Sequence, residues 1–407
     1  MADGPPVIRF EKVDIVFGAR PRAALPLIDA GRSREEILEA TGQVLGVAGA
    51  DLAVGEGQIC VLMGLSGSGK STLLRAVNGL NRVTRGRVLV REETGETDVT
   101  RCDPATLRRL RTRRIAMVFQ QFALLPWRSV ADNVALGLEL RGTAEAERRR
   151  IVAEKLALVG LEQWADKPVH ALSGGMQQRV GLARALATDA DILLMDEPFS
   201  ALDPLIRDRL QDELLELQRR LRKTILFVSH DLDEALKIGS TIAIMEGGRI
   251  VQTGAPEEIV LAPADDYVRS FVANVNPLNV LRLETAMRPL TAAGAVTVPV
   301  GDGRMLDVRL DDRGRPREIW EGRRRLSLAF WEAPREEESA ELVVAGPAGA
   351  SIRLAVAALA ASRRPLLVLD PEGRLIGFVA TDRLLACLRH GGGPVPAVPR
   401  RAERERC

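Results

Sequence analysis

Short apolar runs alternate with Gly-rich turns and amphipathic stretches over roughly the first 280 residues. Continuous apolar runs occur at Ile59–Met63, Ile192–Met195 and Ile225–Ser229, and each predicts a short strand buried on both faces. Apolar positions at helical spacing follow at Thr72–Val77 and Gln177–Ala187. This alternation is typical of an α/β domain with a doubly wound parallel sheet.

After about residue 280 the chain becomes richer in Arg and Pro, and the order of expected elements changes. A β-α-β-β-α order is predicted over Glu341–Ala345, Ile352–Ala361, Pro365–Asp370, Leu375–Ala380 and Asp382–Leu388, with Asp370–Arg374 as a hairpin turn. The last residues, 391–407, are too polar and too rich in Gly and Pro to fold. We therefore expect one domain over 1–278, a smaller α+β domain over 279–390, and a disordered tail.

A segment of about 19–47 lies between two expected strands of the first domain and looks inserted. It contains Ser33 and Glu36 at the spacing of a capping box, so a short helix should begin there, and Gly42 can end it. Loops of this kind usually decorate the surface, and that is the simplest interpretation.

Composition narrows the class of protein. The 407 residues suggest two or three domains, and 46% hydrophobic with 28% charged residues match a soluble globular chain. A net charge of +2 gives no bulk sign of nucleic-acid binding, and four distant cysteines indicate neither a zinc site nor a disulfide framework. No apolar core of a secretory signal is present at the start, and the apolar stretch Leu354–Ala361 is far shorter than the roughly 20 residues of a spanning helix. The sequence thus predicts a cytosolic protein, unless another protein holds it at a membrane.

The clearest motif is a Gly-rich loop between the predicted strand Ile59–Met63 and the helix that begins near Thr72. Main-chain N–H groups of such a loop can surround a phosphate, and the following helix adds its positive N-terminal end. Lys70 should reach the β- and γ-phosphates, and the Ser71 hydroxyl can ligate Mg²⁺. The residues expected to hold nucleotide here are Gly64, Ser66, Gly67, Ser68, Gly69, Lys70, Ser71 and Thr72.

Two carboxylates, Asp196 and Glu197, end the apolar run that begins at Ile192. Ligands of a doubly wound sheet bind at the carboxyl ends of its strands, so Asp196 should emerge beside the Gly-rich loop. Asp196 can hold a metal ion and Glu197 can polarise the water that attacks the γ-phosphate. Together with the loop, these residues form a Walker B motif.

A second phosphate cradle is predicted at Ser173-Gly174-Gly175, at the start of a helix some twenty residues before that strand. The sequence LSGGMQQR around it resembles the signature motif of ATP-binding cassette (ABC) ATPases. Further motifs of that family match in order: Gln120 as the Q-loop glutamine, Ser200–Asp203 as the D-loop, His230 as the switch histidine, and Phe17 as the aromatic residue that stacks on adenine. The resemblance covers roughly residues 7 to 275.

The resemblance implies a RecA-like P-loop cassette with a helical subdomain at about 100–187. Two copies would face head to tail, each ATP held between Lys70 of one and Ser173 of the other. The implied catalytic residues are Glu197, His230 and Gln120; the implied nucleotide contacts add Phe17, Ser173, Gly174, Gly175, Gln177 and Asp203; the implied Mg²⁺ ligands are Ser71, Gln120 and Asp196.

Two classes of function remain for such a cassette: a transporter subunit, or a soluble mechanical ATPase that acts on DNA or the ribosome. About 100 residues without sustained heptads separate the two cradles, and only one cassette is present, which disfavours the second class. The basic run Leu107–Arg114 is more typical of the solvated side of an amphipathic helix than of a nucleic-acid site. We therefore expect a membrane permease as partner, no nucleic acid, and a peripheral position at the cytoplasmic face of the membrane.

Closer similarity points to an importer. The stretches VLMGLSGSGKSTLLRAVNGLN and ALDPLIRDRLQDELLELQ resemble importers of the glycine betaine/proline type, and QQFALLPWRSVADNVALGLEL resembles choline transporters more than proline/betaine ones. Choline is thus the first expectation and glycine betaine or proline the alternative, with a periplasmic or extracellular binding protein as an indirect partner. The apolar loop around Trp127 is expected to receive the permease, the alternative being that Trp127 belongs to the core of its own subdomain.

The stretch PLLVLDPEGRLIGFVATDRLL resembles the second half of a CBS module. Such modules work in pairs, and Ala295–Phe330 is the candidate for a degenerate partner, although no second matching half is visible there. The resemblance implies a regulatory domain that senses ionic strength or a nucleotide. A dimerisation or stability appendage is an equal alternative.

Overall fold

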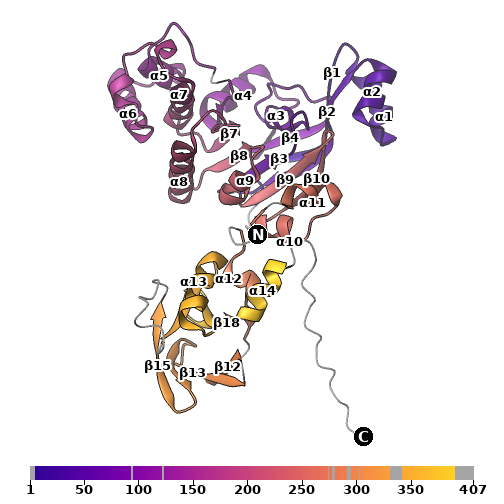
Figure 1. Cartoon of the computed structure of the whole chain (residues 1–407). Helices are drawn as coiled ribbons and strands as arrows, with labels where there is room; N and C mark the ends of the chain where they lie inside the picture. Colours follow the sequence, from indigo (N-terminus) through magenta and orange to yellow (C-terminus); the bar gives the residue numbers. More distant parts are fainter. Residues whose placement is uncertain are drawn as a thin grey trace. The chain divides into compact units, whose positions relative to one another are not determined.

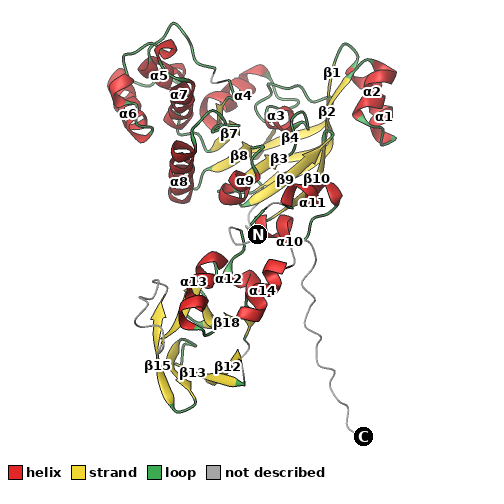
Figure 2. Cartoon of the chain, in the orientation of Figure 1, coloured by secondary structure: helices red, strands yellow, loops and turns green. Residues whose placement is uncertain are grey.

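The computed structural model describes residues 5–92, 95–121, 123–273, 275–276, 280–290, 295–301, 303–330 and 342–389 (Figures 1 and 2). The chain divides into two compact units, Met1–Pro256 and Glu257–Cys407, and each is described by itself. This division precedes the boundary expected at 278, which lies outside the described residues, as do Glu341 and the predicted tail. The reason is packing, because Leu261 already contacts the buried cluster around Leu281 and Leu283 in the second unit.

A six-stranded sheet forms the centre of the first unit, in the order β10-β9-β3-β8-β7-β6. Its strands are β3 (Ile59–Met63), β6 (Ile115–Val118), β7 (Ile192–Asp196), β8 (Thr224–Val228), β9 (Thr241–Glu246) and β10 (Arg249–Gly254). All neighbouring strands are parallel except β9 and β10. Every residue of β3, β7 and β8 is buried, as their continuous apolar sequences predict.

An antiparallel sheet of β2 (Val44–Val54), β1 (Ile8–Phe17), β4 (Arg85–Glu92) and β5 (Gly95–Asp98) completes the core. One apolar cluster joins the two sheets, since it contains Ile8 and Phe10 of β1 together with Leu62 of β3 and Leu194 of β7. Helix α3 (Lys70–Leu74) contributes Leu73 and Leu74 to the same cluster. The first turn of this helix is thereby fixed against both sheets.

Helices α5 (Val130–Leu140), α6 (Glu145–Leu158) and α7 (Gly174–Ala187) group on one side of the first unit (Figure 1). They lie within the range of about 100–187 that is expected for a helical subdomain. Strand β6 belongs to the six-stranded sheet, because Ile115 and Val118 are buried and pair with β7. Other helices of this unit are α4 (Pro104–Arg109), α8 (Pro204–Leu221) and α9 (Leu232–Ile238). None of the helices that the structure describes has the length and apolar character needed to cross a membrane.

The inserted segment folds into a short 3-10 turn (Pro21–Ala24) and helices α1 (Leu25–Asp29) and α2 (Arg34–Thr41). The predicted capping box is confirmed, because Ser33 and Glu36 exchange hydrogen bonds at the start of α2, and Gly42 ends the helix with a φ of +65°. Ile28 and Ile37 of the insertion are buried against Val16 and Leu45. The segment therefore has its own apolar contact with the sheet and is more than a surface decoration.

The second unit contains an eight-stranded sheet, in the order β11-β18-β17-β16-β15-β14-β13-β12. Its elements are α10 (Pro256–Leu261), α11 (Asp266–Val272), α12 (Leu283–Ala286), β11 (Arg288–Pro289), β12 (Ala295–Gly301), β13 (Arg304–Leu310), β14 (Pro316–Glu321), β15 (Arg324–Phe330), β16 (Leu342–Pro347), α13 (Ile352–Ser362), β17 (Leu366–Leu369), β18 (Leu375–Val379) and α14 (Thr381–Arg389). The predicted β-α-β-β-α order and the hairpin after Asp370 are confirmed. The preceding strands β12 to β15 form an antiparallel meander with no helix between them, so they do not repeat that order.

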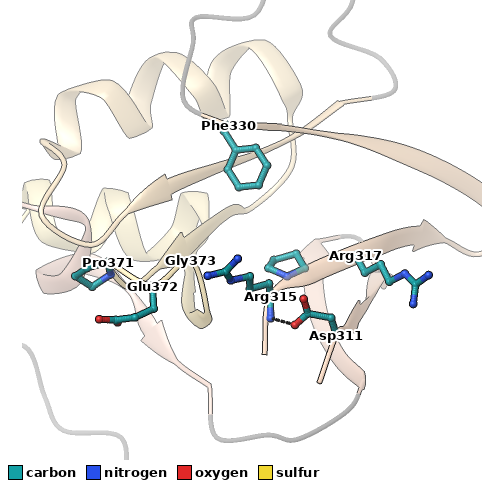
Figure 3. A pocket seen from close by; sticks show the side chains of 8 residues that line it. Asp311, Arg315, Arg317, Phe330, Pro371, Glu372 and Gly373 are labelled. Carbon is teal, nitrogen blue, oxygen red and sulfur yellow. Dashed lines mark hydrogen bonds between the residues drawn. The ribbon is translucent and has the colours of Figure 1, made fainter. Parts of the chain in front are cut away.

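Two hairpin turns of the second unit meet beside a hollow of about 650 Å³ (Figure 3). Both turns have the pattern Asp-x-x-Gly-Arg, at Asp311–Arg315 and Asp370–Arg374, and each Asp accepts hydrogen bonds from the main chain of its own turn. The N–H of Leu375 donates to the carbonyl of Gly314 over 2.9 Å, which fastens one turn to the other. None of the residues expected to bind nucleotide lines this hollow.

Candidate nucleotide site

The Gly-rich loop leaves the carboxyl end of β3 and enters α3, as predicted. Gly64, Gly67 and Gly69 have φ values of +145°, +82° and +103°, which L side chains rarely adopt. A Cβ at Gly64 would lie 2.1 Å from the carbonyl oxygen of Met245, and one at Gly69 would lie 2.4 Å from that of Gly46. The loop thus requires glycine at these positions to form a narrow main-chain cradle.

Lys70 lies inside this cradle. Its Nζ donates to the carbonyl oxygens of Gly64 and Leu65 over 2.8 and 2.9 Å, and the side chain is nearly fully buried. Burial lowers the pKa of Lys70, and the negative charges of Glu197 and Asp196 oppose that shift. The hydroxyl of Ser68 is also buried, and it has no hydrogen-bond partner within the described part of the chain. An ammonium group and a free hydroxyl in a Gly-rich cradle suit phosphate oxygens.

Asp196 joins the cradle to the second carboxylate motif. Its Oδ1 accepts a hydrogen bond from the hydroxyl of Ser71 over 2.7 Å, and its Oδ2 accepts from Nε and Nη2 of Arg75 over 3.0 and 2.8 Å. The Asp196 side chain has no exposed surface, so these bonds compensate a fully buried charge. Sequence reasoning missed Arg75, although it follows Ser71 by one turn at the C-terminal end of α3 and can therefore reach the same carboxylate as Ser71.

Glu197 is held by two of the residues expected to act with it. Nε2 of Gln120 donates to its Oε2 over 3.2 Å, and Nδ1 of His230 lies 3.2 Å from the same oxygen. The main chain of Glu197 has a φ of +48°, and its N–H donates to the carbonyl of Val228 at the end of β8. The structure therefore brings Glu197, Gln120 and His230 together, beside the Ser71–Asp196 pair.

The three residues expected to bind Mg²⁺ do not all contact one another. Ser71 contacts Asp196, whereas the third residue, Gln120, contacts the neighbouring carboxylate of Glu197. Within the described ranges no group of three or more His, Cys, Asp or Glu side chains could hold a metal ion. The donor set that remains is a hydroxyl, a carboxylate and an amide oxygen, which are hard ligands of the kind that Mg²⁺ prefers.

Phe17 stands at the end of β1 with 42% of its surface exposed. A Cβ placed on Gly46 would lie 2.8 Å from Cε2 of Phe17 and 3.0 Å from Cγ2 of Thr72, so the ring borders the start of α3. An exposed aromatic ring at the edge of the phosphate cradle is suited to stack on a base.

The second cradle does not join the first within this chain. Ser173 caps α7 through a hydrogen bond from the N–H of Met176, and Figure 1 shows α7 well apart from α3. The amide of Gln177 donates to the carbonyls of Val169 and Leu172, and Asp203 caps α8. Gly174 and Gly175 begin α7. These residues form a separate surface with an exposed helix N-terminus.

Comparison with known proteins supports one family. A sequence model described as "ABC transporter" matches residues 47–200, and one described as "AAA domain, putative AbiEii toxin, Type IV TA system" matches residues 165–236. The chain is 54% identical over 261 residues to the glycine betaine/proline betaine transport system ATP-binding protein ProV of Salmonella typhimurium, covering 64% of each chain. It is 50% identical to the glycine betaine transport ATP-binding protein OpuAA of Bacillus subtilis, covering 68% of this chain and 65% of that one. The chain therefore spans less than two thirds of the length of these relatives.

A third relative, the glycine betaine/carnitine transport ATP-binding protein GbuA of Listeria monocytogenes, is 48% identical and is covered over 70% of its length. A solved structure of a dimeric ATP-binding cassette in a post-hydrolysis state, bound to ADP and Pi, is 28% identical with a TM-score of 0.53. It corresponds to 61% of this chain and 98% of that chain. With the P-loop, the Walker B carboxylates and the signature motif in place, the chain belongs to the ABC transporter family, among its ATP-binding proteins.

Proposed function

We propose that the chain binds and hydrolyses ATP as the energising subunit of an importer for quaternary amines. The observation that carries this proposal is the position of Glu197, whose carboxylate meets both Gln120 and His230 next to the Ser71–Asp196 pair. A general base that must orient a water molecule needs this kind of support from neighbouring side chains.

The residues divide the work of hydrolysis between them. Lys70 and the Gly-rich main chain hold the β- and γ-phosphates, and Phe17 stacks on the adenine. Ser71, Asp196 and Gln120 would hold Mg²⁺, which would supply neutralising charge to the phosphates. Glu197 orients the attacking water and accepts its proton, while His230 and Gln120 keep the carboxylate in place. The Ser68 hydroxyl, buried and without a partner in the described residues, is available to a phosphate oxygen.

A second copy of the chain completes each site in this proposal. The exposed N-terminus of α7, with Ser173, Gly174 and Gly175, lies apart from α3 in one chain, and the similar solved cassette is described as dimeric. ATP between Lys70 of one copy and Ser173 of the other closes the dimer, and hydrolysis opens it. Gln177 and Asp203 support this surface, since their side chains fix the loop before α7 and the start of α8.

A membrane permease is the proposed partner, and the chain would act at the cytoplasmic face as a peripheral subunit. Trp127 is 77% exposed, which contradicts the alternative that it belongs to the core of its own subdomain. An exposed indole on a loop is a common interface anchor. Three arginines of the basic run have partners within the chain, since Arg109 pairs with Glu92, Arg111 donates to the carbonyl of Asn78 and Arg114 pairs with Asp191. These contacts favour a structural role for them over the alternative of an ATPase acting on nucleic acid.

The substrate class rests on the relatives' names, which print glycine betaine, proline betaine and carnitine. Choline, the first expectation from the sequence, is printed for a relative that is 38% identical. Because these molecules share a quaternary ammonium group, we propose that class, with choline or glycine betaine as the cargo delivered by an external binding protein. The second unit is proposed to regulate transport.

The test is uptake into vesicles that contain the chain with its permease and binding protein, using labelled choline and labelled glycine betaine. We expect ATP-dependent uptake of at least one of them. The Glu197→Gln variant should bind ATP, lose hydrolysis by about 10²-fold or more, and accumulate as a dimer with ATP and Mg²⁺. Size-exclusion chromatography that shows only monomer for this variant at saturating ATP would contradict the two-copy site.

A further inference from the structure

One side chain of the inserted segment reaches the phosphate cradle. Nη1 of Arg34 donates to the main-chain carbonyl of Gly67, and Nε of the same guanidinium donates to the carbonyl of Leu45. Gly67 belongs to the Gly-rich loop, and Leu45 lies in β2, opposite the end of β1. The guanidinium of Arg34 thus bridges the strand beside Phe17 to the tip of the loop.

Three contacts fix the start of α2 and with it the position of Arg34. It is the first residue of α2, directly after the capping residue Ser33, whose hydroxyl accepts from the N–H of Glu36 over 3.2 Å. The carboxylate of Glu36 accepts from the N–H of Ser33 over 2.7 Å. Ile37, one turn further along the helix, is fully buried against the sheet. The start of α2 is therefore fixed both by its cap and by its apolar side.

The hydrogen bond from Arg34 to Gly67 restrains a loop that is conformationally flexible because of its glycines. Gly67 has a φ of +82°, and glycine loses more conformational entropy on ordering than any other residue. The peptide group between Gly67 and Ser68 is held at both ends, because Arg34 binds its carbonyl and its N–H donates to the carbonyl of Leu65 over 3.1 Å. The carbonyl of Ser68 in turn accepts from the N–H of Gly248 over 3.1 Å. Of these hydrogen bonds, the one from Arg34 is made by the inserted segment.

We propose that Arg34 is a positioning residue for the phosphate cradle, and that the insertion is a structural part of the nucleotide site. This inference rests on the proposed ATP-binding function. By holding the Gly67 carbonyl, Arg34 keeps the loop in the conformation that receives phosphate, so less entropy is lost when ATP binds. We expect the effect on nucleotide binding and not on the chemical step, because Arg34 contacts the carbonyl of Gly67 in the loop and that of Leu45 in β2, and not the Glu197 cluster.

The experiment uses the full chain and measures the dissociation constant for ATP with Mg²⁺, together with kcat and KM for hydrolysis. Arg34→Ala should raise Kd and KM about tenfold and leave kcat within about twofold, since the lost interaction is a charge-assisted hydrogen bond remote from the water. Arg34→Lys should restore part of the affinity, because one ammonium group cannot reach both carbonyls as the forked guanidinium does. The matched control is Arg32→Ala, which removes an exposed arginine that pairs with Glu36 over 3.0 Å.

Equal Kd and KM in Arg34→Ala and Arg32→Ala would overturn the proposal, and so would a fall in kcat with unchanged KM. If Arg34→Ala does not fold, Arg34→Lys gives the same test, because an unchanged KM there also overturns it. Failure of the proposed function is distinguishable: the wild-type chain would then bind no ATP, or Lys70→Ala would bind it as well as wild type.

Discussion

Gln178 donates a hydrogen bond from its side-chain amide to the main-chain carbonyl of Glu197 over 3.1 Å. Its amide oxygen accepts from the N–H of Ala201 over 3.3 Å, and the side chain is 1% exposed. A residue of the signature helix thus holds the main chain on both sides of the turn after β7, where Glu197 has its left-handed conformation. The signature motif and the proposed general base are connected through this one side chain.

Gln178→Glu should reduce hydrolysis more than it reduces ATP binding. The substituted carboxylate can still accept from Ala201 but cannot donate to the carbonyl of Glu197. Among the described residues, that carbonyl then keeps the Ser200 hydroxyl as its side-chain donor. We expect kcat to fall about tenfold or more, because misplacing a general base by a fraction of an ångström is costly. Steady-state ATPase kinetics measure this. An unchanged kcat would show that Ser200 and the Val228 contact suffice to hold Glu197.

The conformations of the Gly-rich loop and of the strand that ends at Asp196 were predictable because each is determined by a few residues that are neighbours in the sequence. A strand, a Gly-rich loop, Lys70 and Ser71 in sequence order permit only one local conformation that binds phosphate, and the strand that ends at Asp196 is equally local. The contact of Gln178 with Glu197 was not predictable, because only the packing of α7 against the sheet decides that Gln178, and not its neighbour Gln177, faces Glu197. The same holds for Arg34, which looks in the sequence like any first residue of a helix, and for the unit boundary, which depends on Leu261 packing near Leu281.

Arg75→Ala should make the stability of the chain more dependent on Mg²⁺. Arg75 provides two of the three hydrogen bonds to the buried Asp196, and its own side chain is 37% exposed. Without Mg²⁺ we expect the free energy of unfolding to fall by about 1–3 kcal/mol, as for a buried group that loses its partner. Mg²⁺ with ADP should then stabilise the variant more than wild type. Urea titrations with and without chelator check both statements, and equal Mg²⁺ effects would contradict the idea.

Glu234→Gln should change how stability depends on pH. Burial raises the pKa of Glu234 above its ordinary value of 4.5, although hydrogen bonds from Ser229 and Gln211 oppose the shift. The folded state therefore binds a proton more tightly than the unfolded state, and wild type loses stability as pH rises from 4.5 through the raised pKa. The neutral amide has no such loss. Thermal unfolding should show the stability of the variant increasing relative to that of wild type between pH 4 and pH 8. A constant difference would mean that the pKa of Glu234 is the same in the folded and unfolded states.

Trp127→Ala should uncouple transport from hydrolysis. The side chain is exposed and, as proposed, contacts the permease, so its removal should leave basal ATPase activity of the isolated chain unchanged. We expect uptake in vesicles to fall severalfold. Leu140→Ala is the control, because Leu140 is also a large exposed apolar residue of the helical group, at 61% exposure. Equal uptake by wild type and Trp127→Ala would remove Trp127 as the anchor.

Removal of the second unit should leave ATP hydrolysis intact only if the cut avoids its core. Leu281 and Leu283 are fully buried in a cluster with Ile352 and Leu366, so a chain that ends after Leu281 keeps an apolar segment without its partners. A chain that ends after Asn276 lacks that segment. We expect this shorter chain to hydrolyse ATP like the full chain and to differ in its response to salt, which ATPase assays over a series of KCl concentrations would measure.

The comparison of the two cuts separates regulation from stability. If the second unit is regulatory, the chain ending after Asn276 is soluble and active, with an altered salt profile, whereas the one ending after Leu281 aggregates more through its exposed leucine. Because Leu261 also packs on the cluster, Leu261→Ser in the shorter chain should improve its solubility further. A soluble, active chain with the same salt profile as the full protein would indicate a dimerisation or stability appendage instead. An insoluble or inactive chain after both cuts would mean that the cassette needs the second unit in order to fold.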